Sequence, residues 1–295
     1  MIVITGATGA LNGATIEHLL ERIPAEQIGV SVRDTAKAQH LADRGVRVRR
    51  GPYDDPVALR HSFEGADQIL LVSQNSPHVD GISLHRNAIE AAVAVGVEQI
   101  LYTSHQGAGS DSPFPPAREH AATEALLADS GLAWTSLRNG FYAHSLDWLL
   151  ANWQQTGAII APEDGPISWT DRGDAAEAAA IILSGDRPLH GPVTLTARAA
   201  VTFDDIARIA SELTGRKIER IVMNDEEWIA RQIERGVQEF MARLTLTTFQ
   251  AAREGRFAGV DPLLGNLLDR EPRTVGDLLE ARLAAHERAR ESHAI

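Results

Sequence analysis

Residues 1–13, MIVITGATGALNG, join a short apolar strand to a glycine-rich turn and decide the fold of this chain. Met1 to Ile4 is an apolar run typical of a buried parallel strand, and apolar residues at helical spacing follow the turn. The turn itself, Gly6 to Gly9, needs residues without a Cβ. It directs the free N–H groups and the positive dipole end of the helix to one place, where a pyrophosphate can bind. The stretch therefore predicts a site for a nucleotide cofactor.

A second predicted strand favours one type of cofactor over another. Gln27 to Val32 is followed by Arg33 rather than by an acidic residue. An acid there would accept hydrogen bonds from the adenosine ribose of NAD, whereas arginine can hold a 2′-phosphate with two charge-assisted hydrogen bonds. We therefore expect NADP(H), with NAD(H) as the weaker alternative. Asp34 opposes this preference slightly, and an ordinary solvated charge is the other interpretation of Arg33.

Length and composition limit the class of protein. The 295 residues suffice for one large α/β domain with an appended lobe, or for two smaller domains, and 44% are hydrophobic. A formal net charge of −12 opposes nucleic acid as a partner. The chain contains no cysteine, which excludes disulfides and thiolate chemistry, and its 11 histidines lack metal-ligand spacing.

The sequence contains neither a signal peptide nor an apolar run of the ~18–20 residues that a membrane span requires. We therefore expect a cytoplasmic protein without a membrane partner, acting on a small molecule. The residues leave the oligomeric state open, and a homodimer is compatible with them.

Strand-like and helix-like segments alternate through the first half of the chain, as in a parallel sheet with helices on both faces. The fold class expected is α/β, a doubly wound parallel sheet (Rossmann) with a smaller, interleaved α+β C-terminal substrate lobe. We assign 1–140 to the Rossmann domain and 141–295 to the lobe, with one strand near 193–197 returning to the sheet. The expected strands are 1–5, 27–33, 46–50, 68–73, 98–104 and 134–138, and the helices between them are 12–22, 35–44, 56–64, 82–95 and 117–130.

The lobe is less regular, and Thr274 with Asp277 resembles a capping box that opens its last helix. Its expected helices are 144–155, 174–184, 203–214, 225–236 and 274–290, and its strand-like pieces are 193–197 and 218–223.

Ligands of open parallel sheets bind outside the carboxyl ends of the strands. These ends are rich in small polar residues suited to a dinucleotide. They are Thr5-Gly6, Arg33, Ser73-Gln74-Asn75, Thr103-Ser104-His105 and Arg138-Asn139-Gly140.

The whole set of motifs resembles the NmrA-like group of atypical short-chain dehydrogenases, of the NAD(P)H:quinone oxidoreductase and triphenylmethane reductase type. The resemblance covers nearly the whole chain. It rests on Ile4 to Gly9 (ITGATG), Val32-Arg33 with Ala36-Lys37-Ala38, His85-Arg86-Asn87 with Ala91-Ala92, Tyr102-Thr103-Ser104, Leu126 to Gly131 (LLADSG) and Leu137 to Tyr142 (LRNGFY).

The resemblance also implies roles for individual residues. The pyrophosphate would lie at the glycine turn, and the nicotinamide or substrate near four residues further along. The first group is Gly6, Thr8, Gly9, Ala10 and Leu11, with Arg33 at the 2′-phosphate, and the second is Ser73, Ser104, Asn139 and Phe141. Two departures weaken the match: Asn12 stands where the family usually has a third glycine, and Pro52 stands where it commonly has Asp near the adenine, a place Asp55 could take.

The Tyr-x-x-x-Lys pair of ordinary short-chain dehydrogenases is absent. Its two positions correspond to His120 and Glu124. Histidine can donate a proton near neutral pH, and an acid one helical turn away would orient it and favour its charged form. We predict His120 as the proton donor; the alternative is that both residues only line the helix.

A quinone is reduced easily, so a dedicated acid is dispensable and the enzyme must chiefly hold two rings together. Asn75 and several aromatic side chains are the candidate substrate contacts, with core packing as an equal alternative for the aromatics. The aromatic candidates are Phe114, Phe141, Tyr142, Trp148 and Trp169.

The function expected is an NADPH-dependent oxidoreductase that passes hydride to a quinone-like or conjugated acceptor. Two alternatives remain. One is an NADP-binding, redox-sensing regulator without turnover, and the other is a reductase or isomerase for one specialised metabolite.

Overall fold

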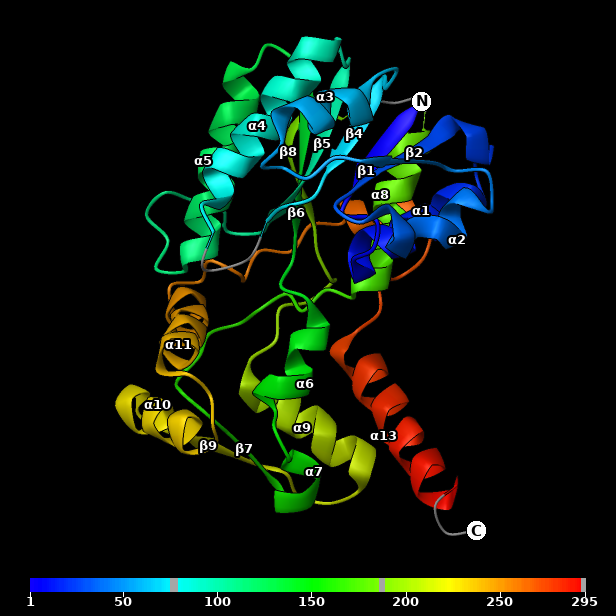
Figure 1. The fold of residues 1–295 in the computed structure, drawn as a ribbon. Coiled ribbons are helices and arrows are strands. Elements are labelled where there is room, and N and C mark those ends of the chain that lie inside the picture. Colours follow the sequence, from blue (N-terminus) through cyan, green and yellow to red (C-terminus); the bar gives the residue numbers. More distant parts are fainter. Residues whose placement is uncertain (75–78, 186–188, 293–295) are drawn as a thin grey trace. The chain divides into compact units, whose positions relative to one another are not determined.

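The computed structural model describes residues 1–74, 79–185 and 189–292. Within them, parallel strands form a seven-stranded sheet in the order β3-β2-β1-β4-β5-β6-β8 (Figure 1). The order reverses between β1 and β4, which makes this the point where ligands of such sheets bind. The strands are β1 (Ile2–Thr5), β2 (Ile28–Val32), β3 (Arg47–Arg50), β4 (Gln68–Leu71), β5 (Gln99–His105), β6 (Ala133–Asn139) and β8 (Gly191–Leu195).

Helices cover both faces of this sheet, which is why β1 and β2 are buried along their whole length (Figure 1). Leu59, Ala88 and Leu127, from three successive helices, pack in one core cluster on one face. On the other face Arg22, which follows the first helix of the chain, approaches Glu177 of the helix Arg172–Ser184 to 4.0 Å. The first face carries α3 (Pro56–Phe63), α4 (Gly81–Val95) and α5 (Pro115–Asp129), and the second carries α1 (Ala10–Leu20), α2 (Gln39–Ala42) and α8 (Arg172–Ser184). The doubly wound parallel sheet is thus confirmed.

The chain divides into two compact units that interleave in sequence. The first contains Met1–Asp111, Pro116–Asn139 and Gly173–Leu195, and the second contains Ser112–Pro115, Gly140–Arg172 and Thr196–Ile295. Helix 174–184, which we placed in the lobe, therefore lies in the first unit, and β8 pairs with β6 in its sheet.

The second unit has its own core, built on a short parallel pair of strands and several helices. Phe203, Phe249 and Phe257 are buried at its centre. Its last long helix opens with the predicted capping box: the hydroxyl of Thr274 accepts from the N–H of Asp277, whose carboxylate accepts from the N–H of Thr274. The elements are α6 (Leu146–Leu149), α7 (Trp153–Thr156), β7 (Ala158–Ala161), α9 (Phe203–Thr214), β9 (Glu219–Val222), α10 (Asp225–Glu234), α11 (Glu239–Arg253), α12 (Leu263–Leu268) and α13 (Val275–Ser292).

One local expectation for the second unit is wrong, and one of its helices was not expected. The helix expected at 144–155 is broken into α6 and α7, because Ala151 between them adopts a left-handed conformation with φ 49°. We also missed α11, whose three threonines, Thr245, Thr247 and Thr248, are β-branched and weaken the helical signal.

Candidate cofactor and substrate residues

The turn after β1 would be strained by any residue other than glycine at its first position. Gly6 has φ +62°, and a Cβ added there would lie 2.5 Å from Cγ1 of Val72. The turn closes with a hydrogen bond from the N–H of Gly9 to the carbonyl oxygen of Gly6, at 2.9 Å. Glycine is therefore favoured at residue 6 both by the backbone conformation and by the close approach of Val72, which follows β4.

The N-terminus of α1 is open to an anion. No side chain caps it, and its first turn holds no acidic residue. Thr8, Gly9 and Ala10 are exposed there and Leu11 is partly exposed. The unused N–H groups of the first turn and the helix dipole therefore fit a pyrophosphate.

Asn12 stands where the third glycine was expected, and α1 still packs against the end of β1. Its side chain is buried, and Nδ2 donates to the carbonyl oxygen of Thr5 at 2.8 Å. This bond ties α1 to the end of β1, so the departure is accommodated by a specific contact rather than by a gap.

Tyr53, next to the other departure at Pro52, also supports the turn. Its hydroxyl donates to the carbonyl oxygen of Val72 at 2.9 Å and lies 2.6 Å from Oγ1 of Thr5. Asp55 caps α3 through the N–H of Ala58 and pairs with Arg50, so its carboxylate is engaged there.

Arg33 is the free charge at the end of β2. It is exposed and, among the described residues, its guanidinium forms no hydrogen bond or ion pair. The carboxylate of Asp34 beside it accepts a hydrogen bond from the N–H of Ala36 and so caps the short 3-10 helix Thr35–Ala38. At this strand end the guanidinium of Arg33 is therefore available to a ligand, whereas the carboxylate of Asp34 is engaged.

The ends of β4 and β5 are joined by hydrogen bonds. The N–H of Ser73 donates to Oγ1 of Thr103 at 2.9 Å. One residue further, the N–H of Gln74 donates to Nε2 of His85 at 2.7 Å. Asn75, our candidate substrate contact, lies outside the described residues.

The tautomer of His85 follows from its partners. Since Nε2 accepts from Gln74, the proton is on Nδ1, which donates to Oγ1 of Thr123 at 2.8 Å. Burial lowers the pKa of His85 to about 4, so the ring is neutral at pH 7. His85 thus holds the chain that leaves β4 in a fixed position.

Glu124 does not orient His120, contrary to our expectation. Its Oε1 accepts from the hydroxyls of Ser104 at 2.8 Å and Ser136 at 2.6 Å, and the carboxylate pairs with Arg138. The hydroxyl hydrogen of Ser104 is therefore directed to α5 in this structure.

His120 contacts Tyr102 instead. Its Nδ1 lies 2.9 Å from the hydroxyl oxygen of Tyr102, and its ring stacks on that of His105. Burial, followed by the neighbouring rings of His105 and His85, lowers the pKa of His120 well below 6.5. The expectation of a favoured charged form is wrong, because burial and the two neighbouring histidine rings disfavour a charge on His120.

In the second unit, a short backbone pairing places the aromatic candidates. The N–H of Thr170 donates to the carbonyl oxygen of Phe141 at 2.8 Å, and a Cβ on Gly140 would lie 2.2 Å from Oγ1 of Thr170. Phe141 packs against Phe114 and Trp169, with ring centroids 6.0 and 5.3 Å apart.

Burial separates these aromatic side chains into two groups. Trp169 and Phe141 are only 1% and 9% exposed, which favours core packing for them. Phe114 and Tyr142 keep accessible surface. In the first unit Asn139 is buried at the end of β6, and its carbonyl oxygen accepts from the N–H of Gln106.

The described residues contain no group of three or more potential metal ligands. None of the described helices is both long and apolar enough to cross a membrane.

The reversed strand order, the glycine turn and the open helix N-terminus define a dinucleotide-binding α/β protein. The chain belongs to the NmrA-like family, whose model matches residues 1–270.

Curated and solved relatives match over almost the full length. The chain is 34% identical to quinone oxidoreductase 2 of Escherichia coli, over 94% of this chain and 96% of that one. The crystal structure of the E. coli NADPH-dependent quinone oxidoreductase with NADPH has a TM-score of 0.89 at 33% identity, covering 96% and 99% of the two chains. Triphenylmethane reductase of Citrobacter sp., solved with NADP(H), has a TM-score of 0.85 at 32% identity, covering 94% and 98%.

Proposed function

We propose that this chain transfers hydride from NADPH directly to a quinone-like or other conjugated small-molecule acceptor. The observation that carries the proposal is the unpaired guanidinium of Arg33 at the end of β2, which pairs with β1, the strand that leads into the open N-terminus of α1. The helix N-terminus would hold the pyrophosphate that NADPH and NADH share, and Arg33 would hold the 2′-phosphate that only NADPH carries.

The coarser part of this function follows from family and relatives. The chain is an NAD(P)H-dependent oxidoreductase of the quinone reductase type, with NADP(H) as its cofactor. Direct hydride transfer and the class of acceptor are the parts that we propose.

The bound cofactor would supply a hydride, which is one proton with two electrons, and the acceptor needs a further proton from elsewhere. We propose that Gly6, Thr8, Gly9, Ala10 and Leu11 hold the pyrophosphate and that Arg33 holds the 2′-phosphate.

We propose that the nicotinamide and the acceptor lie near Ser73, Asn139 and Phe141, with Phe114 and Tyr142 offering ring faces to the acceptor. The remaining proton comes from solvent or from the Tyr102–His120 pair, whose 2.9 Å contact allows proton exchange between the two rings.

The test is a titration of NADPH and NADH against the purified protein, followed by a small quinone while the absorbance of the reduced cofactor is measured. We expect tighter binding of NADPH and oxidation of one NADPH for each quinone reduced. Transfer of deuterium from stereospecifically labelled NADPH, with a primary isotope effect, would support direct hydride transfer.

Other outcomes separate the alternatives. Tight NADPH binding without turnover of any quinone would favour the redox-sensing regulator. Turnover confined to one complex aromatic metabolite would favour the specialised reductase, and absence of binding would contradict the cofactor assignment to this turn.

A further inference from the structure

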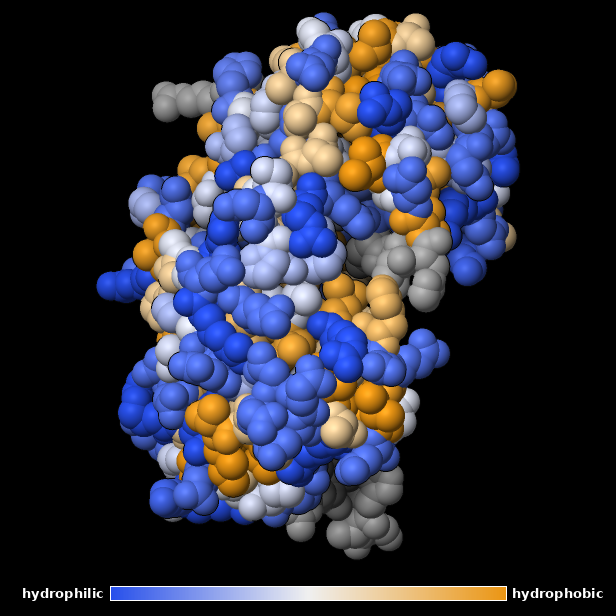
Figure 2. Space-filling view, turned by 90° about the vertical axis from the view of Figure 1, so that its left-hand side faces the viewer, coloured by the Kyte–Doolittle hydropathy of each residue, from blue (hydrophilic) through white to orange (hydrophobic). Residues whose placement is uncertain are grey.

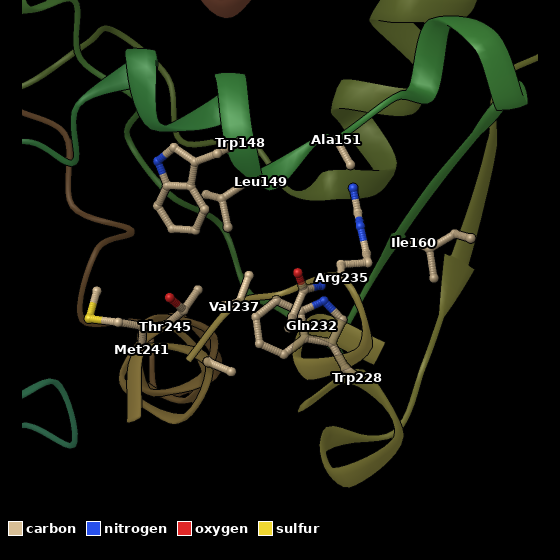
Figure 3. A pocket seen from close by; sticks show the side chains of 11 residues that line it. Trp148, Leu149, Ala151, Ile160, Trp228, Gln232, Arg235, Val237, Met241 and Thr245 are labelled. Atoms are coloured by element: carbon tan, nitrogen blue, oxygen red, sulfur yellow. The ribbon is translucent and has the colours of Figure 1, made fainter. Parts of the chain in front are cut away.

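A pocket of about 260 Å³ lies entirely within the second unit, and Trp148 is the one aromatic candidate from the sequence that lines it (Figure 3). Residues from α6, β7, α10 and α11 line it. Its volume lies just below the roughly 300–1,000 Å³ typical of pockets for drug-sized molecules, so it suits a smaller ligand.

The walls of the pocket are aromatic and aliphatic. Trp148 and Trp228 contribute two indole rings; the first is 53% exposed and the second only 5%. Leu149, Val237 and Met241 add aliphatic surface. Figure 2 shows hydrophobic surface among the polar residues on the side of the second unit that carries α10 and α11. Such walls favour a flat, apolar ring system.

The polar side chains that line the pocket have no partner among the described residues. Arg235, Gln232 and Thr245 all line it, and none of their side chains forms a hydrogen bond or ion pair in the part of the chain that the structure describes. In Figure 3 the guanidinium of Arg235 extends across the pocket toward Ala151. Arg235 is exposed, so its guanidinium lies at the open side of the pocket, beside the apolar walls and free to meet an anion from solvent.

We infer that this pocket binds a small planar aromatic carboxylate. The ring system lies against the exposed face of Trp148, and the carboxylate accepts two hydrogen bonds from the Arg235 fork, with Gln232 and Thr245 as further donors. A protein segment would satisfy the apolar walls equally well. The small volume of the pocket, with one unpaired guanidinium in its lining, favours the aromatic anion.

The test uses the full-length protein without cofactor and 2-naphthoate as the probe, with binding measured by calorimetry. The neutral isostere 2-naphthamide is the reference ligand. Because a charge-assisted bidentate contact is replaced by a neutral one, we expect the acid to bind about tenfold more tightly or better. Tryptophan fluorescence should be quenched in parallel.

Substitutions in the lining of the pocket test whether 2-naphthoate binds there. Arg235→Gln should reduce the affinity for 2-naphthoate to that for 2-naphthamide, and Trp148→Ala should weaken both ligands. Arg231→Gln, one turn earlier on α10 and outside the pocket lining, is the matched control and should bind like the unaltered protein. Circular dichroism of each variant verifies that it is folded.

Equal affinities for the acid and the amide would overturn the inference, as would an affinity that Arg235→Gln leaves unchanged. Absence of binding of 2-naphthoate at millimolar concentration would also overturn it. The inference does not rest on the proposed function, since the measurement includes neither cofactor nor turnover.

Discussion

The carboxylate of Glu124 accepts two hydrogen bonds from the guanidinium of Arg138, at 2.9 and 2.5 Å. Glu124 lies on α5 and Arg138 on β6, so the pair fixes this helix to the sheet. The hydroxyls of Ser104 and Ser136 also donate to Oε1 of this carboxylate. Glu124 is therefore the centre of a polar cluster under the end of the sheet, where an acid–base role was expected for its neighbour His120.

Glu124→Gln should destabilise the protein by about 2 kcal/mol or more, because the half-buried guanidinium of Arg138 loses its counter-charge. Urea unfolding measures the change. Glu90→Gln, an exposed acid on α4, is the control and should change the free energy of unfolding by less than about 0.5 kcal/mol. Equal effects of the two substitutions would contradict a structural role of the pair.

Arg33→Ala should weaken NADPH binding about tenfold or more and leave NADH binding nearly unchanged, since only NADPH carries the 2′-phosphate. Fluorescence titration of both cofactors checks this. Arg60→Ala removes an exposed arginine of α3 and should alter neither affinity. Equal losses for NADPH and NADH in Arg33→Ala would refute the 2′-phosphate contact.

Gly6→Ala should abolish tight cofactor binding and destabilise the protein by about 1–3 kcal/mol through backbone strain and contact with Val72. Gly96→Ala is a matched control, because Gly96 also has positive φ, at +76°, but a Cβ there would meet nothing within 4 Å. The excess cost at residue 6 measures the steric contact. Similar costs for the two variants would show that Val72 moves aside freely.

His120→Gln should lower kcat with little change in KM for the acceptor and flatten the pH profile of kcat, if this ring supplies the proton. Tyr102→Phe should give a similar but smaller effect, because it removes only the partner of Nδ1. Steady-state kinetics with a simple quinone over a range of pH tests both variants. Unchanged pH profiles would assign the proton to solvent.

Stability should fall as the pH drops below 6.5 toward 4. His85 is neutral in the native state, with its pKa lowered to about 4 by burial, whereas an unfolded histidine titrates near 6.5. The unfolded chain therefore binds an extra proton in this window, which costs about 1.4 kcal/mol per pH unit for one residue.

His85→Gln should reduce this pH dependence by the contribution of one proton, and His40→Gln, at an exposed position, should leave it unchanged. Thermal melts between pH 4 and 8 measure both. An identical slope in His85→Gln and the unaltered protein would contradict the assignment.

The features that sequence predicts well are local. The apolar run before Gly6 and the position of Arg33 depend on neighbours a few residues away, and the structure places both at adjacent strand ends. The strands of the sheet fall within a few residues of their expected bounds for the same reason.

The features that sequence misses depend on distant residues. Glu124 meets Arg138 only because α5 packs on β6, and no spacing rule connects the two. The pocket around Arg235 joins Trp148 to α10 and α11 across many residues. The apolar residues of 239–253 recur at helical spacing, which was the available signal for α11. The β-branched threonines in this segment weakened that signal.

The return of β8 to the sheet has a consequence for how the chain is made. During synthesis, β6 leaves the ribosome well before Gly191 to Leu195 exist, and until then its outer edge has no partner. An unpaired strand edge invites association with other chains. A gene fragment ending at Asn139 would preserve that exposed edge permanently, so shortened versions of this protein should retain the sequence through Leu195.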